Sequence, residues 1–403
     1  MTFTRRDFLQ QGAGGLTLIA SGVSVPAFLA KAALTAKPGR DNKILVVIQM
    51  TGGNDGLNTV IPFRNDIYHR LRPSLGIKQQ QTLRISDELG LHPDMTAMLR
   101  LYDQGMVNII NNVGYPNPDR SHFRSMDIWH TASTQPEKVN DGWLGRLTDI
   151  SENAQPFALY LDGTTLPLAL KTKHTPVPSV HDISAFHLEN NDKTLKQALS
   201  LPRNSQNDDL LYVQRVAVAG CNIASRMADM HKEKSVDYDY PQYALASRLK
   251  QIADLIAADF GPRVYYTSLG GFDTHANQPL VHGNLLRQLS ESVASFFSDL
   301  NKRRLADRVL VMTFSEFGRR VSENASRGTD HGVAAPMFVI SPQCQPGIRG
   351  GEPDLEHLLA GDIPHHVDFR SVYADILDNW LNVNHRKVLG RQFTSAGVFP
   401  ESV

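Results

Sequence analysis

Short runs of apolar, β-branched residues alternate with helix-length amphipathic segments, and this alternation constrains the fold more than any other feature. The expected strands are 44-ILVVIQM-50, 107-VNIINNV-113, 157-FALYL-161, 264-VYYTSLG-270, 308-RVLVMTFS-315 and 336-PMFVIS-341. Continuous apolar runs of this length fit strands that are buried on both faces of a sheet. The expected helices cover roughly 208–231, 239–259, 280–303 and 369–382. The alternation predicts an α/β layer fold with a mostly parallel sheet.

Composition narrows the class of protein. The 403 residues are 41% hydrophobic and 20% charged, which is typical of a soluble globular protein of one large or two ordinary domains. The formal net charge is zero, which argues against a nucleic-acid partner. The only two cysteines, Cys221 and Cys344, exclude a disulfide framework and a cysteine-based metal site.

The N-terminus has the pattern of an export signal. Two adjacent arginines in 4-TRRDFLQ-10 precede a weakly apolar, glycine-rich stretch that ends near 30-AKA-32. This pattern predicts a twin-arginine signal over residues 1–32, and therefore the twin-arginine translocation machinery as a partner and a periplasmic or secreted mature protein from about Ala33. The segment is too short and too weakly apolar to serve as a stable transmembrane anchor. Further along, the polar segment 171–207 is expected to be a cap, an insertion or a mobile loop.

Polar residues follow four of the expected strands, at the point where each strand ends. Ligands of open α/β sheets bind beyond the carboxyl ends of the strands, so these residues are the first candidates for a functional site. Carboxylates and imidazoles in one cluster suit Zn²⁺, Mn²⁺ or Mg²⁺. The candidate metal ligands are Asp55, Asp273, His275, Glu316, Asp330 and His331.

Four further residues are candidates for catalysis or substrate binding. Ser121 is either a helix N-cap or a nucleophile, and His122 beside it is a metal ligand, a general acid or a bystander. Arg120 and Arg319 are either clamps for phosphate or sulfate oxygens or surface charges. Asn54, between glycines in 51-TGGNDG-56, either positions an anionic group of the substrate or shapes the turn, which we favour.

Taken in order, the motifs resemble a known family. The twin-arginine start, TGGNDGLNTVIPF, RSHF…DIWHTAS, GGFDTH, FSEFGR and GTDHG are similar to those of the exported bacterial domain-of-unknown-function family 1501, from about Lys43 to about Leu389. That family is placed in the alkaline phosphatase and sulfatase superfamily. The resemblance implies a single alkaline phosphatase-like domain over 33–403, a three-layer α/β/α sandwich with its metals at the strand ends.

The resemblance also implies roles for individual residues. Asp55 would be the first-strand metal ligand, Ser121 would stand in the nucleophile region, and the pairs Asp273–His275 and Asp330–His331 would complete a site for one or two ions, Zn or Mn. The spacing departs from the phosphatase pattern, since only Thr274 separates Asp273 from His275, and Glu316 is a candidate to replace a missing ligand. Neither cysteine lies in a sulfatase motif, so attack by Ser121 and attack by water both stay open.

Two functions of different classes follow. The first is an exported metal-dependent hydrolase or transferase that acts on phosphate or sulfate esters, with in-line attack at the strand-end metal site and a small anionic ester as substrate. The altered ligand spacing motivates the second, an exported non-catalytic binding or assembly protein on the same scaffold. A metal-dependent hydrolase of another bond, such as an amide, is a weaker third interpretation.

Overall fold

The computed structural model describes residues 43–151, 157–163, 165–175, 177, 179–180 and 238–400. Its centre is a nine-stranded sheet in the order β11-β5-β10-β9-β1-β8-β6-β7, with β12 paired to the end of β5. The strands are β1 (Ile44–Thr51), β5 (Val107–Gly114), β6 (Ala158–Leu161), β7 (Ser179–Val180), β8 (Val264–Gly270), β9 (Val309–Phe314), β10 (Ala335–Ile340), β11 (Gly347–Arg349) and β12 (Val367–Asp368).

The sheet is parallel apart from one strand. β1 pairs in parallel with β8 on one side and with β9 on the other, whereas β10 runs antiparallel to both β9 and β5. A second sheet has the order β2-β4-β3, from β2 (Val60–Pro62), β3 (Leu83–Arg84) and β4 (Leu89–Leu91). With eight of nine strands in one direction, the loops after β1, β5, β8 and β9 reach the same edge of the large sheet.

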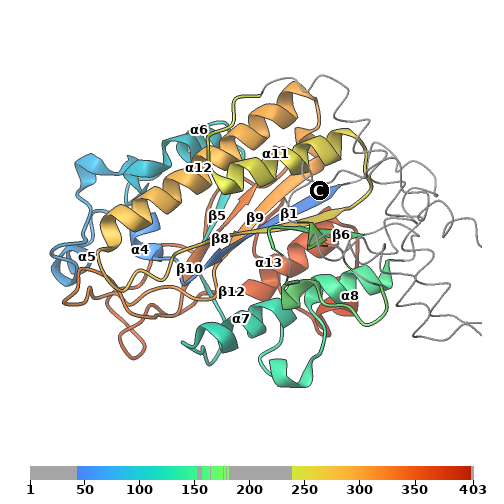
Figure 1. Cartoon of the computed structure of the whole chain (residues 1–403). Coiled ribbons are helices and arrows are strands. Elements are labelled where there is room, and N and C mark those ends of the chain that lie inside the picture. The colour runs from blue at the N-terminus through green and yellow to red at the C-terminus, as the bar shows by residue number, and fades with distance from the viewer. Residues whose placement is uncertain are drawn as a thin grey trace, which may run out of the picture.

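Helices cover both faces of the large sheet. One face carries α6 (Thr96–Asp103), α11 (Ala244–Ala257) and α12 (Gln278–Lys302), and the other carries α7 (His122–Thr131), α8 (Trp143–Ile150) and α13 (Phe369–Asp375) (Figure 1). A π-helical turn (Ile376–Trp380) continues α13, and α14 (His385–Leu389) packs on the same side. The short helices α4 (Gly56–Thr59) and α5 (Asp66–Leu71) lie beyond the end of β1.

The central strands are apolar on both faces because they contribute to two cores. In β1, Val46 and Ile48 pack in the core beneath α11 and α12, while Leu45 and Val47 pack in the core beneath α7 and α13. Successive side chains of a strand point to opposite faces, so a strand covered on both sides cannot alternate apolar and polar residues. This confirms the expected α/β sandwich with a mostly parallel sheet.

The expected elements are recovered with shifted bounds. All six expected strands are present, and the expected helices 239–259 and 280–303 correspond to α11 and α12. The expected helix 369–382 is divided between α13 and the π-helical turn. The two- and three-residue strands β2, β3, β4, β7, β11 and β12 were not expected, because runs so short carry no periodicity. The expected signal 1–32, the expected helix 208–231 and most of 171–207 lie outside the described residues.

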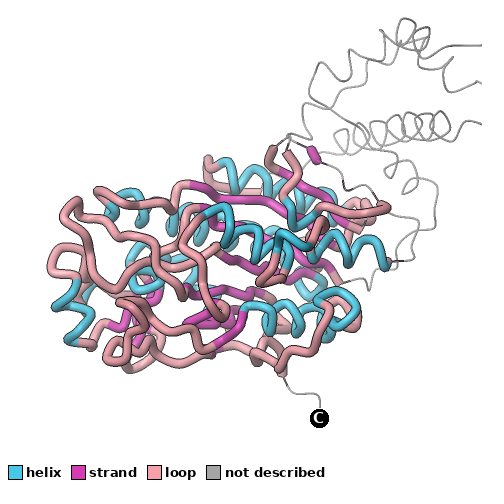
Figure 2. The backbone as a smooth tube through the Cα atoms, turned by 90° about the horizontal axis from the view of Figure 1, so that it is seen from below, coloured by secondary structure: helices cyan, strands magenta, loops and turns pink. Residues whose placement is uncertain are grey.

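Loops form one end of the molecule, beyond the ends of the strands (Figure 2). Within the described part of the chain, no helix combines the length and the apolar character needed to cross a membrane. The loop end is where the expected site residues gather.

Candidate metal site

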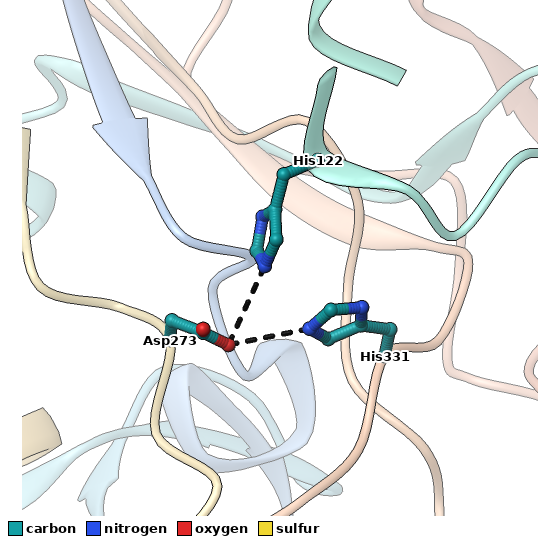
Figure 3. A group of neighbouring side chains, drawn as sticks. All are labelled: His122, Asp273 and His331. Atoms are coloured by element: carbon teal, nitrogen blue, oxygen red, sulfur yellow. Dashed lines mark hydrogen bonds and ion pairs between the residues drawn. The ribbon is translucent and has the colours of Figure 1, made fainter. Parts of the chain in front are cut away.

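Three side chains from different loops point toward one another at the carboxyl edge of the sheet. They are His122 at the start of α7, Asp273 after β8 and His331 after β9 (Figure 3). Asp273 Oδ1 lies 3.5 Å from His122 Nε2 and 3.2 Å from His331 Nε2. His275 joins them, with its Nε2 3.1 Å from the same Oδ1 and 2.9 Å from His331 Nε2. We call these four residues the His–Asp cluster.

The other ring nitrogen of each histidine is already engaged. His122 Nδ1 lies 2.8 Å from Glu316 Oε1, and His275 Nδ1 lies 3.1 Å from Asp330 Oδ1. His331 Nδ1 lies 2.8 Å from the Arg120 carbonyl oxygen, which can only accept, so this nitrogen carries the proton. Metal-binding histidines typically use their second nitrogen in this way, on a carboxylate or a backbone carbonyl.

This engagement decides what the cluster can hold. When Nδ1 carries the proton, a neutral ring has only a lone pair at Nε2, and a carboxylate oxygen also only accepts. The Nε2 atoms therefore face Asp273 without a hydrogen between them unless a ring is protonated or a cation lies among them. Within the described residues, the buried His122 Nε2 has no hydrogen-bond partner. The residues present thus fit a divalent cation.

Charges around the cluster keep its carboxylates ionised and make the His122 ring more basic. Burial acts to raise the pKa of Asp273, but the hydrogen bond from Arg319 and its charge outweigh burial, so this pKa lies below its usual value. Hydrogen bonds from Asn324 and His275 lower the pKa of Asp330. The hydrogen bond to Glu316 raises the pKa of His122, which makes the ring more basic. Asp273 and His275 expose 48% and 44% of their side chains, so the cluster is open to a substrate.

Arg319, an expected substrate-binding residue, is instead a buried clamp. Its guanidinium donates to Asp273 Oδ1 at 2.6 Å and to the carbonyl oxygens of Gly52, Gly53, Phe272 and Thr329. The side chain has no exposed area, so a substrate cannot reach it from solvent. Arg319 therefore ties together the loops after β1, β8 and β9 and fixes the position of Asp273.

The glycines of 51-TGGNDG-56 allow this close packing. Gly52 has φ +121°, and an added Cβ would lie 2.4 Å from Asp273 N. Gly53 has φ +79°, and its Cβ would lie 2.4 Å from the Phe317 ring. Both positions need glycine for the left-handed backbone and for the space.

The expected ligand Asp55 and its neighbour Asn54 lie outside the His–Asp cluster. Asp55 is buried and paired with Arg72, at 2.6 Å for Oδ2 and 2.9 Å for Oδ1, and Gln278 also donates to Oδ2. The Asn54 side-chain oxygen accepts from Thr59 and lies 3.0 Å from His282 Nε2. Both side chains hold the loop against α4, α5 and α12, so the turn-shaping interpretation of Asn54 agrees with its position.

Ser121 and Arg120 border the cluster without contacting it through their side chains. Ser121 is the exposed N-cap residue of α7, but its hydroxyl makes no capping hydrogen bond. The Arg120 guanidinium pairs with buried Asp362. Glu316, expected as a ligand, supports His122, and Asp330 supports His275. The sequence did not indicate the ion pairs made by Arg72, Asp362 and Arg320. No local pattern marks a charged residue whose partner is distant in sequence.

Three histidines outside the cluster are buried in their neutral form. Burial lowers the pKa of His130 and His282 to about 3 and that of His92 to about 4. In the unfolded chain these rings take up protons near pH 6.5. Between about pH 6.5 and about pH 4, the unfolded state therefore binds more protons than the folded state, and stability falls as the pH falls.

We expect the free energy of unfolding to be lower at about pH 5 than at about pH 7. A His130→Gln variant should lose less over the same interval, by about 1–2 kcal/mol, since one depressed group is removed. Urea denaturation of both proteins at the two pH values measures this difference. Equal losses in the variant and the wild type would contradict the assignment to His130.

Together, the α/β fold and the His–Asp cluster define a protein with a candidate divalent-metal site at the carboxyl edge of its sheet. The chain belongs to the family described as "Protein of unknown function (DUF1501)", whose model matches residues 42–395. This confirms the family expected from the sequence motifs. No curated protein matches the sequence significantly.

Several solved structures are similar to this chain at low identity. "Ps i-CgsB in complex with k-i-k-neocarrahexaose" is 10% identical, with a TM-score of 0.40, over 88% of this chain and 73% of that chain. The C-terminal periplasmic domain of EcEptC from Escherichia coli, in complex with Zn, is 10% identical, with a TM-score of 0.36, over 76% and 75%. A protein in the alkaline phosphatase superfamily from Vibrio parahaemolyticus is 8% identical, with a TM-score of 0.37, over 80% and 69%. Likenesses of this degree carry no conclusion about activity.

Proposed function

We propose that this protein is an exported metal-dependent enzyme that hydrolyses or transfers a phosphate or sulfate ester group. One observation carries the proposal: three imidazole Nε2 atoms converge on one carboxylate oxygen while each Nδ1 is already engaged. Such an arrangement is typical of a metal site with its outer hydrogen bonds in place. The arginine pattern of 4-TRRDFLQ-10 supports export.

The donor set indicates the kind of metal. Three imidazole nitrogens and one carboxylate oxygen, from His122, His275, His331 and Asp273, suit Zn or Mn better than Mg, which prefers oxygen ligands. The cluster provides donors for one ion, since Asp55 is paired with Arg72. A cation held there would supply Lewis acidity at the reacting ester group.

The chain's own residues prepare the site for this chemistry. Glu316, Asp330 and the Arg120 carbonyl keep the three rings oriented with Nε2 toward Asp273, and Arg319 fixes Asp273 itself. The Ser121 hydroxyl makes no capping contact and stands between two residues that take part in the site. It is the candidate nucleophile for in-line attack, and water is the alternative.

The test combines metal content with turnover. We expect elemental mass spectrometry to find about one equivalent of Zn or Mn in the mature protein and in a His357→Ala control, whose exposed histidine pairs with Asp354. His331→Ala should lose both the metal and any activity on a panel of phosphate and sulfate esters. Full metal content or retained turnover in His331→Ala would overturn the proposal.

A second candidate is an exported binding or assembly protein without turnover. The observation that favours it is the buried pairing of Asp55 with Arg72, because the resemblance assigns Asp55 to the metals. This candidate predicts at most one tightly bound structural ion and no turnover on any ester of the panel. Turnover that disappears in His331→Ala would exclude it.

A further inference from the structure

Two arginines share one buried carboxylate beside the His–Asp cluster. Arg120 Nη2 forms an ion pair with Asp362 Oδ2, and Arg320 Nε lies 3.6 Å from Asp362 Oδ1. The Asp362 side chain is 1% exposed, whereas those of Arg120 and Arg320 are 38% and 33% exposed. We call Arg120 and Arg320 the arginine pair.

The backbone of the arginine pair is hydrogen-bonded to His331 of the cluster and to its neighbour Asp330. The Arg120 carbonyl accepts from His331 Nδ1 at 2.8 Å, and the Arg320 N–H donates to the Asp330 carbonyl at 2.9 Å. Arg319, next to Arg320, forms a β-bridge with His331. The backbone of both arginines is therefore fixed to the segments that supply His331 and its neighbour Asp330.

The arginine pair carries more positive charge and more hydrogen-bond donors than Asp362 can satisfy. Two guanidiniums face one carboxylate, so one positive charge is not neutralised within this trio. Arg320 Nη1 donates to the Ala360 carbonyl, and within the described residues neither the buried Arg120 Nε nor Asp362 Oδ1 has a hydrogen-bond partner. A guanidinium has five N–H donors in a planar fork, which matches the oxygens of phosphate or sulfate.

We propose that the arginine pair binds the non-reacting oxygens of a tetrahedral oxyanion, the phosphate or sulfate group of the substrate, beside the metal site. Asp362 is the buried carboxylate that faces both guanidiniums and competes with the anion for them. The inference rests on the proposed function for the identity of the anion as substrate. It assigns anion recognition to Arg320 with Arg120, because Arg319 is buried among backbone carbonyls.

Equilibrium binding tests this inference without turnover. Isothermal titration of inorganic phosphate, and separately of sulfate, into the mature protein with and without metal gives the affinity of each anion. Arg320→Gln is expected to weaken binding of the favoured anion by about tenfold or more, as expected for loss of charge-assisted hydrogen bonds. The matched control is Arg64→Gln, a half-exposed arginine paired with Glu88, which should bind as the wild type does.

Asp362→Asn separates anion recognition from a structural role. It removes the carboxylate that competes with the anion, so this variant should bind the anion at least as tightly as the wild type does. If Arg120, Arg320 and Asp362 had only a structural role, both Arg320→Gln and Asp362→Asn would lose anion binding. Unchanged binding in Arg320→Gln, or equal weakening in Arg320→Gln and Asp362→Asn, overturns the inference. Anion binding is measured in metal-free protein as well. A failure to bind metal would therefore contradict the proposed function without contradicting this inference.

Discussion

Replacing Arg72 with methionine is expected to lower the free energy of unfolding by about 3–5 kcal/mol, because it leaves the Asp55 carboxylate buried without its charge partner. All five donors of the Arg72 guanidinium are used: they reach both oxygens of Asp55, the Asn58 side chain and the carbonyls of Val321 and Arg320. Neither Arg72 nor Asp55 has any exposed side-chain area, so water cannot replace the lost bonds.

Urea denaturation compares this variant with two others. Arg64→Met breaks the exposed pair with Glu88, and we expect it to cost less than about 1 kcal/mol. The double variant Arg72→Met/Asp55→Leu should be more stable than Arg72→Met alone, since no unpaired charge stays buried. A loss below about 1 kcal/mol in Arg72→Met would show that the pair contributes little to folding.

Replacing Glu316 with glutamine is expected to weaken Zn²⁺ binding by about 10- to 100-fold, the usual cost of losing an outer carboxylate. Glu316 is fully buried, and its Oε1 holds His122 Nδ1 at 2.8 Å and accepts the Gly52 N–H at 2.9 Å. Glutamine keeps the size and one acceptor but removes the negative charge that makes the imidazole basic. The expected loss is therefore in metal affinity rather than in the fold.

Competition with a chelator of known affinity measures this change, and thermal melting of the metal-free proteins checks the fold. Glu323→Gln is the matched control, because Glu323 accepts backbone N–H bonds from Ser74 and Leu75 and contacts no residue of the His–Asp cluster. We expect the control to bind Zn²⁺ as the wild type does. Equal affinity in Glu316→Gln would mean that His122 does not ligate the metal through Nε2.

The location of the candidate site could be predicted from the sequence, because strand ends and glycine-rich loops are local features. Asp273, His275 and His331 were expected at the carboxyl edge of the sheet and meet there. His122 was expected beside the nucleophile region, with ligation as one of its open roles. Its approach to Asp273 depends on how α7 packs against the sheet, which no local pattern specifies.

The roles of the remaining residues depend on partners far along the chain. Asp55 follows a strand as a ligand would, but Arg72, 17 residues later, takes up its charge. Glu316 was expected to bind metal directly and instead bonds to His122, 194 residues earlier. Arg319 and Arg320 are adjacent, yet one is buried among backbone carbonyls and the other is one-third exposed beside Asp362.

By itself, the sequence determined the alternation of strands and helices, the fold class, the family and the edge of the sheet where polar residues gather. These depend on periodicity, on glycine and on residue order, all of which are read along the chain. Only the tertiary structure decided which side chains meet at Asp273, which carboxylates pair with arginines and which arginines face solvent. Those choices depend on distances of a few ångströms between segments remote in sequence, and packing of the whole fold sets such distances.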